Sequence, residues 1–160
     1  MKRIFVCLLI LAGRASAADD VARLPLVNSD FPISAAVTVR SDLDLVFLSG
    51  ALPKATNTDA PKGTPPVFGN MEQQTVSCLT SLKATLARMG LGMGDVVKMN
   101  VFMVPDKEGK LDFAGLMAGY TQFFGTKDQP NKPARSAVGV AALVAPGAMV
   151  EIEVIAAKPR

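Results

Sequence analysis

The stretch KPARSAVGVAALVAPGAMVEIEVIA, residues 132–156, decides how the fold of this chain is predicted. It is almost wholly apolar, small and β-favouring, yet it carries one arginine near its start and two glutamates near its end. From residue 150 onward, apolar side chains alternate with Glu151, Glu153 and Ile155, a period of two that is typical of a strand with one buried face. Because a buried charge is costly without a partner, each of the three charges needs a structural or functional explanation.

Arg135 lies on the first predicted strand of this stretch, at about residues 135–144. Alternation places it on the same strand face as Ala137 and Gly139, whose small side chains leave room beside the guanidinium. Solvent, a ligand or another chain must fill that room. Arg135 is therefore a candidate ligand-binding residue, with a structural ion pair across a subunit interface as the alternative.

The two predicted strands, 135–144 and 149–156, are expected to form a hairpin around a turn at Pro146-Gly147. Glu151 then sits opposite Ala142, and Arg135 lies seven residues further along, about 20 Å away on a strand. At that distance the two charges act on one small substrate only if the sheet bends strongly or if the site combines two chains.

Outside this stretch, strand and helix patterns follow one another along the chain. Strands at 35–39 and 45–50 are expected to form a hairpin, and helices are expected from about 70 to 90 and over 111–124, around a strand at 95–104. Two helices cannot cover both faces of such a sheet, which predicts an α+β fold, β-β-α-β-α-β-β, with both helices on one face. The Pro-rich segment at residues 51–70, between the second strand and the first helix, is expected to be a lid, rim or contact loop, with disorder as the alternative.

Residues 1–17 have the three parts of a secretory signal peptide: a basic start, an apolar run and Ala15-Ser16-Ala17 before the expected cleavage point. The apolar run covers residues 4–12, about half of the ~20 residues that span a bilayer, so an uncleaved membrane anchor is the weaker alternative. The expected organisation is a signal peptide (1–17), an N-terminal tail (18–33) and one domain (34–160). We expect a periplasmic or secreted protein with no stable membrane association after cleavage.

Composition excludes several kinds of chemistry. Cleavage removes three of the 17 basic residues and leaves 14 against 14 acidic ones, so the mature chain has no excess positive charge with which to bind nucleic acid. The chain has no histidine, which excludes His-based triads and His metal clusters. After cleavage Cys78 is the only cysteine, so an intrachain disulfide is excluded. No metal site is predicted.

The motifs PARSAVGVAAL and VEIEVIA, with FLSG earlier and GDVVKMNVFM between them, resemble the Rid (YjgF) family of enamine/imine deaminases from about residue 30 to the C-terminus. The resemblance implies a chorismate-mutase-like fold, a homotrimer with clefts between subunits, and no cofactor. It also implies hydrolysis of reactive 2-imino acids and their enamine tautomers to 2-oxo acids and ammonia. Arg135 matches the family's carboxylate-binding arginine, Glu151 its water-orienting glutamate, and Ser49 and Gly50 its pocket-lining pair.

Three positions of the expected pocket depart from the family pattern. Ile33 stands where many members have tyrosine, Ala137 where cysteine is common, and Met117 where the second helix carries asparagine. These residues make the expected substrate pocket more apolar. The alternative function is therefore a non-catalytic exported trimer that binds small carboxylates. A nuclease is disfavoured by the balanced charge of the mature chain.

Overall fold

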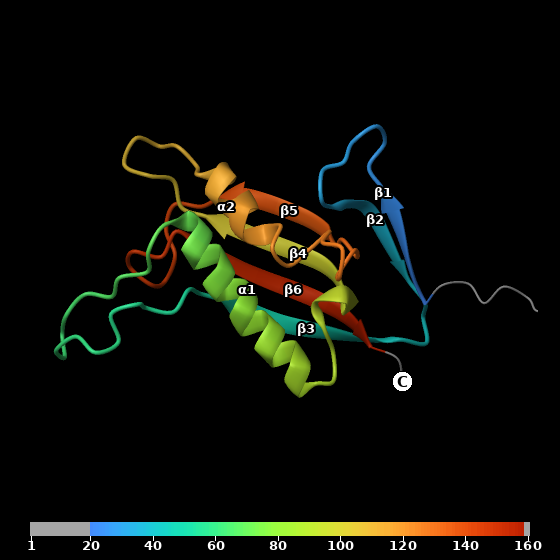
Figure 1. Cartoon of the computed structure of the whole chain (residues 1–160), viewed down its shortest axis with the longest axis horizontal. Helices are drawn as coiled ribbons and strands as arrows, with labels where there is room; N and C mark the ends of the chain where they lie inside the picture. The colour runs from blue at the N-terminus through green and yellow to red at the C-terminus, as the bar shows by residue number, and fades with distance from the viewer. Residues whose placement is uncertain (1–19, 159–160) are drawn as a thin grey trace, which may run out of the picture.

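The computed structural model describes residues 20–158, so the predicted signal peptide lies outside the described residues. The chain forms one six-stranded sheet and two α-helices, which confirms the predicted α+β class (Figure 1). The elements are β1 (Val21–Pro25), β2 (Ser34–Val39), β3 (Asp44–Ala51), α1 (Met71–Arg88), a 3-10 turn η1 (Met93–Asp95), β4 (Val96–Met103), α2 (Phe113–Tyr120), β5 (Ala134–Gly139) and β6 (Val150–Lys158).

The sheet order is β1-β2-β5-β4-β6-β3, and both helices pack on one side of it, as predicted (Figure 1). We call that side the helix face and the other the open face. Alternation along the central strands sorts the side chains: Met99, Val101 and Met103 of β4 and Val150, Ile152 and Val154 of β6 are buried under the helices. The residues between them, which include Glu151 and Glu153, therefore point to the open face.

Helix α1 begins and ends where its sequence predicts. The Asn70 side chain accepts a hydrogen bond from the Gln73 N–H, and the Gln73 side chain accepts one from the Asn70 N–H, which forms a capping box. The side chains on the side of α1 that faces the sheet, among them Cys78, Leu79 and Leu86, are fully buried. The helix stops before Gly90, whose φ of +74° is a backbone conformation that glycine adopts without strain.

Both predicted hairpins are wrong. Strands β5 and β6 do not pair with each other, because β4 lies between them and pairs parallel with β5 and antiparallel with β6. Strand β3 pairs antiparallel with β6 at the far edge, whereas β2 pairs with β1 and touches β5. The turn at Pro146-Gly147 exists, but it belongs to a longer connection that carries the chain past the end of β4.

The segment predicted as an N-terminal tail contains strand β1, which forms a hairpin with β2. Arg23 fastens this hairpin to the body of the domain by donating hydrogen bonds to the carbonyls of Gly94 (2.9 Å), Val96 (3.0 Å) and Lys132 (2.8 Å). Strand β2 meets β5 only at the pair Ser34–Ala134. Beyond that pair, the outer edge of β5 is unpaired within the described residues.

The Pro-rich segment between β3 and α1 is a long loop that extends from one end of the sheet (Figure 1). It closes on itself through hydrogen bonds from the Thr56 N–H to the Val67 carbonyl (2.6 Å) and between the Asn57 side chain and both Pro65 and Val67 (2.9 Å each). Phe68, which lies where the loop leads into α1, is buried. The loop's predicted role as a lid, rim or contact stays a prediction. Within residues 20–158, none of the helices has the length and apolar character that crossing a bilayer requires.

Candidate functional site

Arg135 points to the helix face of β5, because it is in parallel register with the buried Met99 of β4. Its guanidinium carbon lies 4.4 Å from the ring centroid of Tyr120, 5.4 Å from that of Phe31 and 5.8 Å from that of Phe113. We call Phe31, Phe113 and Tyr120 the aromatic cage. The electron-rich faces of such rings attract a cation, so the cage stabilises the charge without neutralising it.

The Arg135 guanidinium has no carboxylate partner among residues 20–158. Its two terminal nitrogens instead face the Met117 sulfur, at 3.3 and 3.4 Å. A thioether is a weak acceptor, and a guanidinium carries five N–H donors, so most of its hydrogen-bonding capacity remains unused. Burial lowers the pKa of Arg135, an effect that the Tyr120 phenol partly offsets. The arrangement is a partly desolvated cation that lacks an anion.

The aromatic cage depends on a contact between distant parts of the chain. The Tyr120 hydroxyl donates a hydrogen bond of 2.8 Å to the Pro32 carbonyl, which holds the segment before β2 against α2. The Phe31 and Phe113 rings then stack with their centroids 6.2 Å apart. Burial raises the pKa of Tyr120 well above its usual value, against the opposing charges of Arg135 and Arg23, so the phenol keeps its donor proton.

Replacing Tyr120 with phenylalanine is expected to lower the free energy of unfolding by about 1 kcal/mol, because the ring over Arg135 stays but the hydrogen bond to Pro32 is lost. Urea denaturation measures the change. Thr85→Val is the matched control, since it removes an exposed hydroxyl that bonds within α1 and should cost less. Equal costs for the two variants would show that the Tyr120 hydroxyl does not hold the N-terminal segment in place.

Ser49, Gly50 and Glu151 form a second group of predicted site residues. The register between β3 and β6 shifts between Leu48 and Ala51, where β3 carries one extra residue as a β-bulge. Within this bulge the Glu151 carboxylate lies against Gly50, in space that any Cβ at that position would occupy. A groove of about 430 Å³ runs beside the bulge, between β3 and residues of α1 that include Ser81, Thr85 and Met89.

The structure brings the predicted site residues together in two groups that do not meet within one chain. Arg135 shares its surroundings with Met117, with Ala137 two residues along the same strand face, and with Ile33, which packs against the core close to Phe31. Ser49, Gly50 and Glu151 lie near the opposite edge of the sheet.

The expected distance between Arg135 and Glu151 also changes. Glu151 sits opposite Phe102 of β4, not opposite Ala142, and Arg135 sits beside Met99. Two strand spacings and three residues of rise separate their Cα atoms, about 14 Å in place of 20 Å. Their side chains nevertheless leave opposite faces of the sheet, so bending cannot bring them onto one small substrate.

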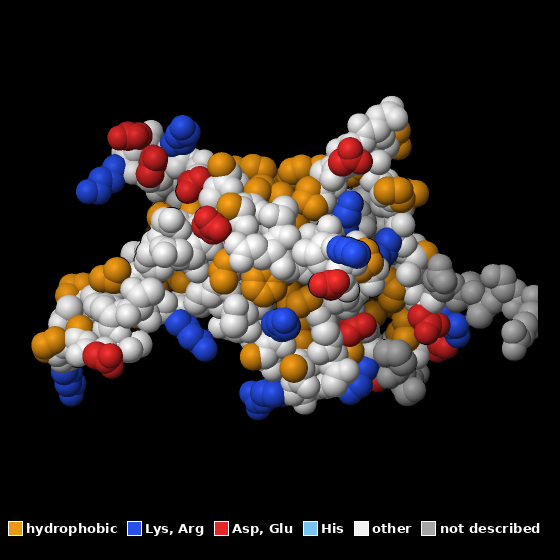
Figure 2. Space-filling model, in the orientation of Figure 1, with side chains coloured by type: hydrophobic (Ala, Val, Ile, Leu, Met, Phe, Trp, Pro, Cys, Tyr) orange, Lys and Arg blue, Asp and Glu red, His pale blue; other side chains and the backbone are white. Residues whose placement is uncertain are grey.

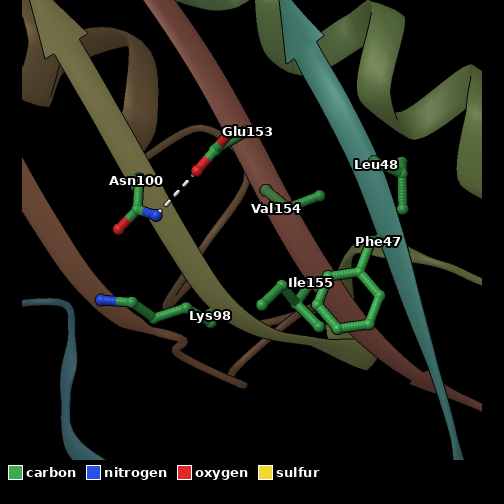
Figure 3. Close-up of a pocket in the computed structure, with 7 residues that line it drawn as sticks. All are labelled: Phe47, Leu48, Lys98, Asn100, Glu153, Val154 and Ile155. Atoms are coloured by element: carbon green, nitrogen blue, oxygen red, sulfur yellow. Dashed lines mark hydrogen bonds between the residues drawn. The ribbon is translucent and has the colours of Figure 1, made fainter.

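A cavity of about 320 Å³ opens on the open face (Figure 3). Phe47 and Ile155 form its apolar wall, and Asn100 donates a hydrogen bond of 2.8 Å to Glu153 across it. At its margin the Lys98 amine lies 3.1 Å from the Ser136 hydroxyl. Glu153 thus has a hydrogen-bond partner on β4.

Among residues 20–158, no group of three or more His, Cys, Asp or Glu side chains is placed to hold a metal ion.

The aromatic cage is the part of the site that the sequence analysis missed. Phe113 and Tyr120 lie in the predicted helix at 111–124 but were not predicted as site residues, and Phe31 lies in the segment predicted as a tail. The dipeptide Phe31-Pro32, an aromatic residue and a proline directly after the polar residues 28–30, was the available signal.

Comparison with known proteins places these features in a family. The family model described as Endoribonuclease L-PSP matches residues 21–158. The chain is 35% identical to the Escherichia coli K12 protein named putative reactive intermediate deaminase TdcF, over 71% of this chain and 79% of that one. The solved structure of E. coli TdcF with bound serine is similar with a TM-score of 0.56 and 30% identity, covering 79% of this chain and 94% of that one.

A Rid-family protein of unknown function from Yersinia pestis, YyfB, has the same fold with a TM-score of 0.65 and 24% identity, over 86% of this chain and 98% of that one. Fold, motifs and family model agree. The chain therefore belongs to the Endoribonuclease L-PSP family, the Rid (YjgF) family that its sequence resembles.

Proposed function

We propose that this protein is a deaminase that hydrolyses reactive 2-imino acids to 2-oxo acids and ammonia. The observation that carries the proposal is the partly buried Arg135 guanidinium, which has aromatic rings around it and no carboxylate partner in the described part of the chain. A substrate carboxylate supplies the missing anion through paired charge-assisted hydrogen bonds. The name of the related TdcF supports a deaminase role.

The chemistry requires positioning more than strong acid or base. An imine carbon is already electrophilic, so a water molecule held beside it adds to the C=N bond to give a carbinolamine, which then expels ammonia. In the proposed mechanism Glu151 orients that water and accepts its proton, while Arg135 holds the carboxylate in place. Neither histidine nor an electron-transferring cofactor is needed, which is consistent with the composition of the chain.

We further propose that the working site forms between subunits of a homotrimer. The two groups of site residues lie at opposite edges of the main sheet, with Arg135 and Ala137 on β5 and Ser49 and Gly50 on β3. Joining the β5 edge of one chain to the β3 edge of the next would bring the residues around Arg135 in the first chain close to Ser49, Gly50 and Glu151 in the second. Such head-to-tail contacts close into a ring when the rotation between chains permits, and the resemblance implies three chains.

Two features of the chain favour this assembly. The first is the open face of the sheet. That face carries exposed apolar side chains that a monomer would leave in water, among them Phe47 (72% exposed) and Val138 (47%). The groove beside Ser49 and Gly50 is the space that the neighbour's Arg135 edge would enter.

The direct test is to generate 2-iminopropanoate and 2-iminobutanoate in place with an amino-acid oxidase and to follow their decay with and without the protein. Acceleration proportional to protein concentration, with equal amounts of 2-oxo acid and ammonia formed, is the expected result. Decay at the uncatalysed rate for both imines would overturn the deaminase proposal.

Replacing Gly50 with alanine is expected to lower kcat/KM for 2-iminobutanoate roughly tenfold to a hundredfold, because the added Cβ pushes the Glu151 carboxylate away. The matched control is Gly92→Ala, since the nearest atom to a Cβ there is 3.9 Å away. Thermal unfolding of both variants separates a displaced carboxylate from a general loss of structure. A Gly50→Ala variant with normal kinetics would exclude Glu151 from the reaction.

The second candidate function is a non-catalytic trimer that binds small carboxylates. The contact of Arg135 with the Met117 thioether favours it, because the departures at Ile33, Ala137 and Met117 leave Arg135 with few polar neighbours. Titration calorimetry with 2-oxobutanoate decides between the two. Binding that requires Arg135, without acceleration of imine decay, would favour the binding protein.

We also propose that the protein is exported and cleaved after Ala17. The basic, apolar and small-residue parts of residues 1–17 support this localisation. Expression of the full chain in a bacterial host, followed by fractionation and N-terminal sequencing, tests it. Mature protein that begins at Ala18 in the periplasm is expected, whereas a cytoplasmic product with an intact N-terminus would contradict export.

RNA is not the proposed substrate, although the family model carries an endoribonuclease description. Lys and Arg side chains are scattered among Asp and Glu over the face viewed in Figure 2, without a continuous basic track on that face. Non-specific RNA binding relies on such a track and weakens steeply with salt. Salt-dependent RNA binding by the mature protein would revive the nuclease alternative.

A further inference from the structure

We propose that Met117 is an oxidation site through which peroxides switch off carboxylate binding at Arg135. The Met117 sulfur lies at similar distances, 3.3 and 3.4 Å, from both terminal nitrogens of the guanidinium. A carboxylate can bind a guanidinium end-on, with its two oxygens facing the two terminal nitrogens. The Met117 sulfur occupies the position that those oxygens would take. The inference rests on the proposed role of Arg135 as the carboxylate anchor.

In the reduced protein the thioether is a removable occupant. Sulfur is a weak hydrogen-bond acceptor, whereas a carboxylate makes charge-assisted bonds to the same nitrogens. Methionine also has three rotatable side-chain bonds, so the sulfur can swing aside when a ligand arrives. Met117 thus blocks Arg135 only weakly in this state.

Oxidation reverses this competition. A sulfur lone pair attacks one oxygen of hydrogen peroxide, the O–O bond breaks, and the departing hydroxide takes the proton of the OH group now bound to sulfur to leave water. The sulfur is oxidised by two electrons and becomes a sulfoxide, and the peroxide is reduced. The sulfoxide oxygen is a strong acceptor, and a small withdrawal of the flexible side chain lets it accept hydrogen bonds from the two guanidinium nitrogens that the sulfur now faces. Because it is tethered, it competes with free ligand at a high effective concentration.

The location of Met117 favours selective reaction. Met117 on α2 and Arg135 on β5 are both partly exposed, so a peroxide can reach the sulfur from solvent. Met71, Met93, Met99 and Met103 are buried, which leaves Met89 and Met149 as the other solvent-reached methionines in the described residues. Burial raises the pKa of the Cys78 thiol to about 12, so Cys78 holds little of the thiolate that peroxides attack.

The experiment measures binding of 2-oxobutanoate by calorimetry before and after treatment with hydrogen peroxide, with mass spectrometry of peptides to quantify the Met117 sulfoxide. Oxidised protein is expected to bind roughly tenfold to a hundredfold more weakly. Methionine sulfoxide reductases acting on both epimers should restore the affinity.

Two variants isolate the residue responsible. Met117→Leu keeps side-chain volume but cannot be oxidised, so its affinity, whatever its starting value, should not change with peroxide. Met89→Leu/Met149→Leu leaves Met117 as the sole partly exposed methionine among residues 20–158 and should keep the full effect. Unchanged affinity with Met117 fully oxidised, or a loss that persists in Met117→Leu, overturns the inference. If unoxidised protein does not bind 2-oxobutanoate, the anchoring role of Arg135 fails and this inference falls with it.

Discussion

Arg135→Lys is expected to lower kcat/KM for 2-iminobutanoate about 100- to 1,000-fold, although the charge at position 135 is retained. Lysine offers a compact point charge, whereas the guanidinium makes two parallel hydrogen bonds to a carboxylate and stacks on the rings of the aromatic cage. Each hydrogen bond to a charged group contributes about 1.5–3 kcal/mol, so losing one or two of them accounts for a change of this size. Steady-state kinetics with imines formed in place measures it.

The matched control is Arg88→Lys, which changes an exposed arginine in the last turn of α1 and should leave the kinetics unchanged. Circular dichroism and thermal unfolding establish that Arg135→Lys is folded. The division between KM and kcat is informative: a change confined to KM indicates an anchor that holds substrate and transition state equally. A variant with near-normal kcat/KM would show that Arg135 does not hold the carboxylate through its fork.

Mixing two inactive variants is expected to restore activity. Arg135→Ala and Glu151→Ala each damage one of the two groups, which lie on opposite faces of the sheet in one chain. If each site takes Arg135 from one subunit and Glu151 from the next, random trimers from an equal mixture contain about one quarter intact sites. Unfolding and refolding the mixture, followed by the imine assay, should therefore recover about a quarter of the native activity.

A complementary mixture makes the result quantitative. An equal mixture of native protein and the double variant Arg135→Ala/Glu151→Ala should have, per total protein, about a quarter of the native specific activity if sites span two chains, but about half if each chain holds its own site. No recovery from the two single variants, together with half activity in the second mixture, would place the whole site in one chain. Each variant refolded alone is the baseline, and size-exclusion chromatography with light scattering tests whether the proposed trimer forms.

The features that the sequence predicted well are those encoded by neighbouring residues. The cap at Asn70 and the inward spacing of Leu79, Leu82 and Leu86 are properties of one helix, which is why a helix from about 70 to 90 could be predicted and α1 confirms it. The alternation around Glu151 predicted the buried and open faces of β6. Arg135 and Glu151 were recognised from motifs, and motifs do not depend on how the strands pair.

The pairing of the strands was predicted wrongly, because partners in a sheet are chosen by contacts between distant residues. Locally, the two strands around Pro146-Gly147 look like a hairpin. In the folded chain β4, which comes earlier in the sequence, lies between them and buries apolar side chains against both. Because β4 lies between β5 and β6, Arg135 and Glu151 are closer together than in the predicted hairpin, and their side chains are on opposite faces of the sheet.

The sequence by itself determined the family, the fold class and the chemical character of the candidate site. Only the tertiary structure decided which residues surround the arginine. Pro32 and Tyr120 are 88 positions apart, and their hydrogen bond brings Phe31 onto a cation from another strand. No local pattern encodes that contact, because it exists only once α2 has packed on the sheet and the N-terminal segment has docked against it.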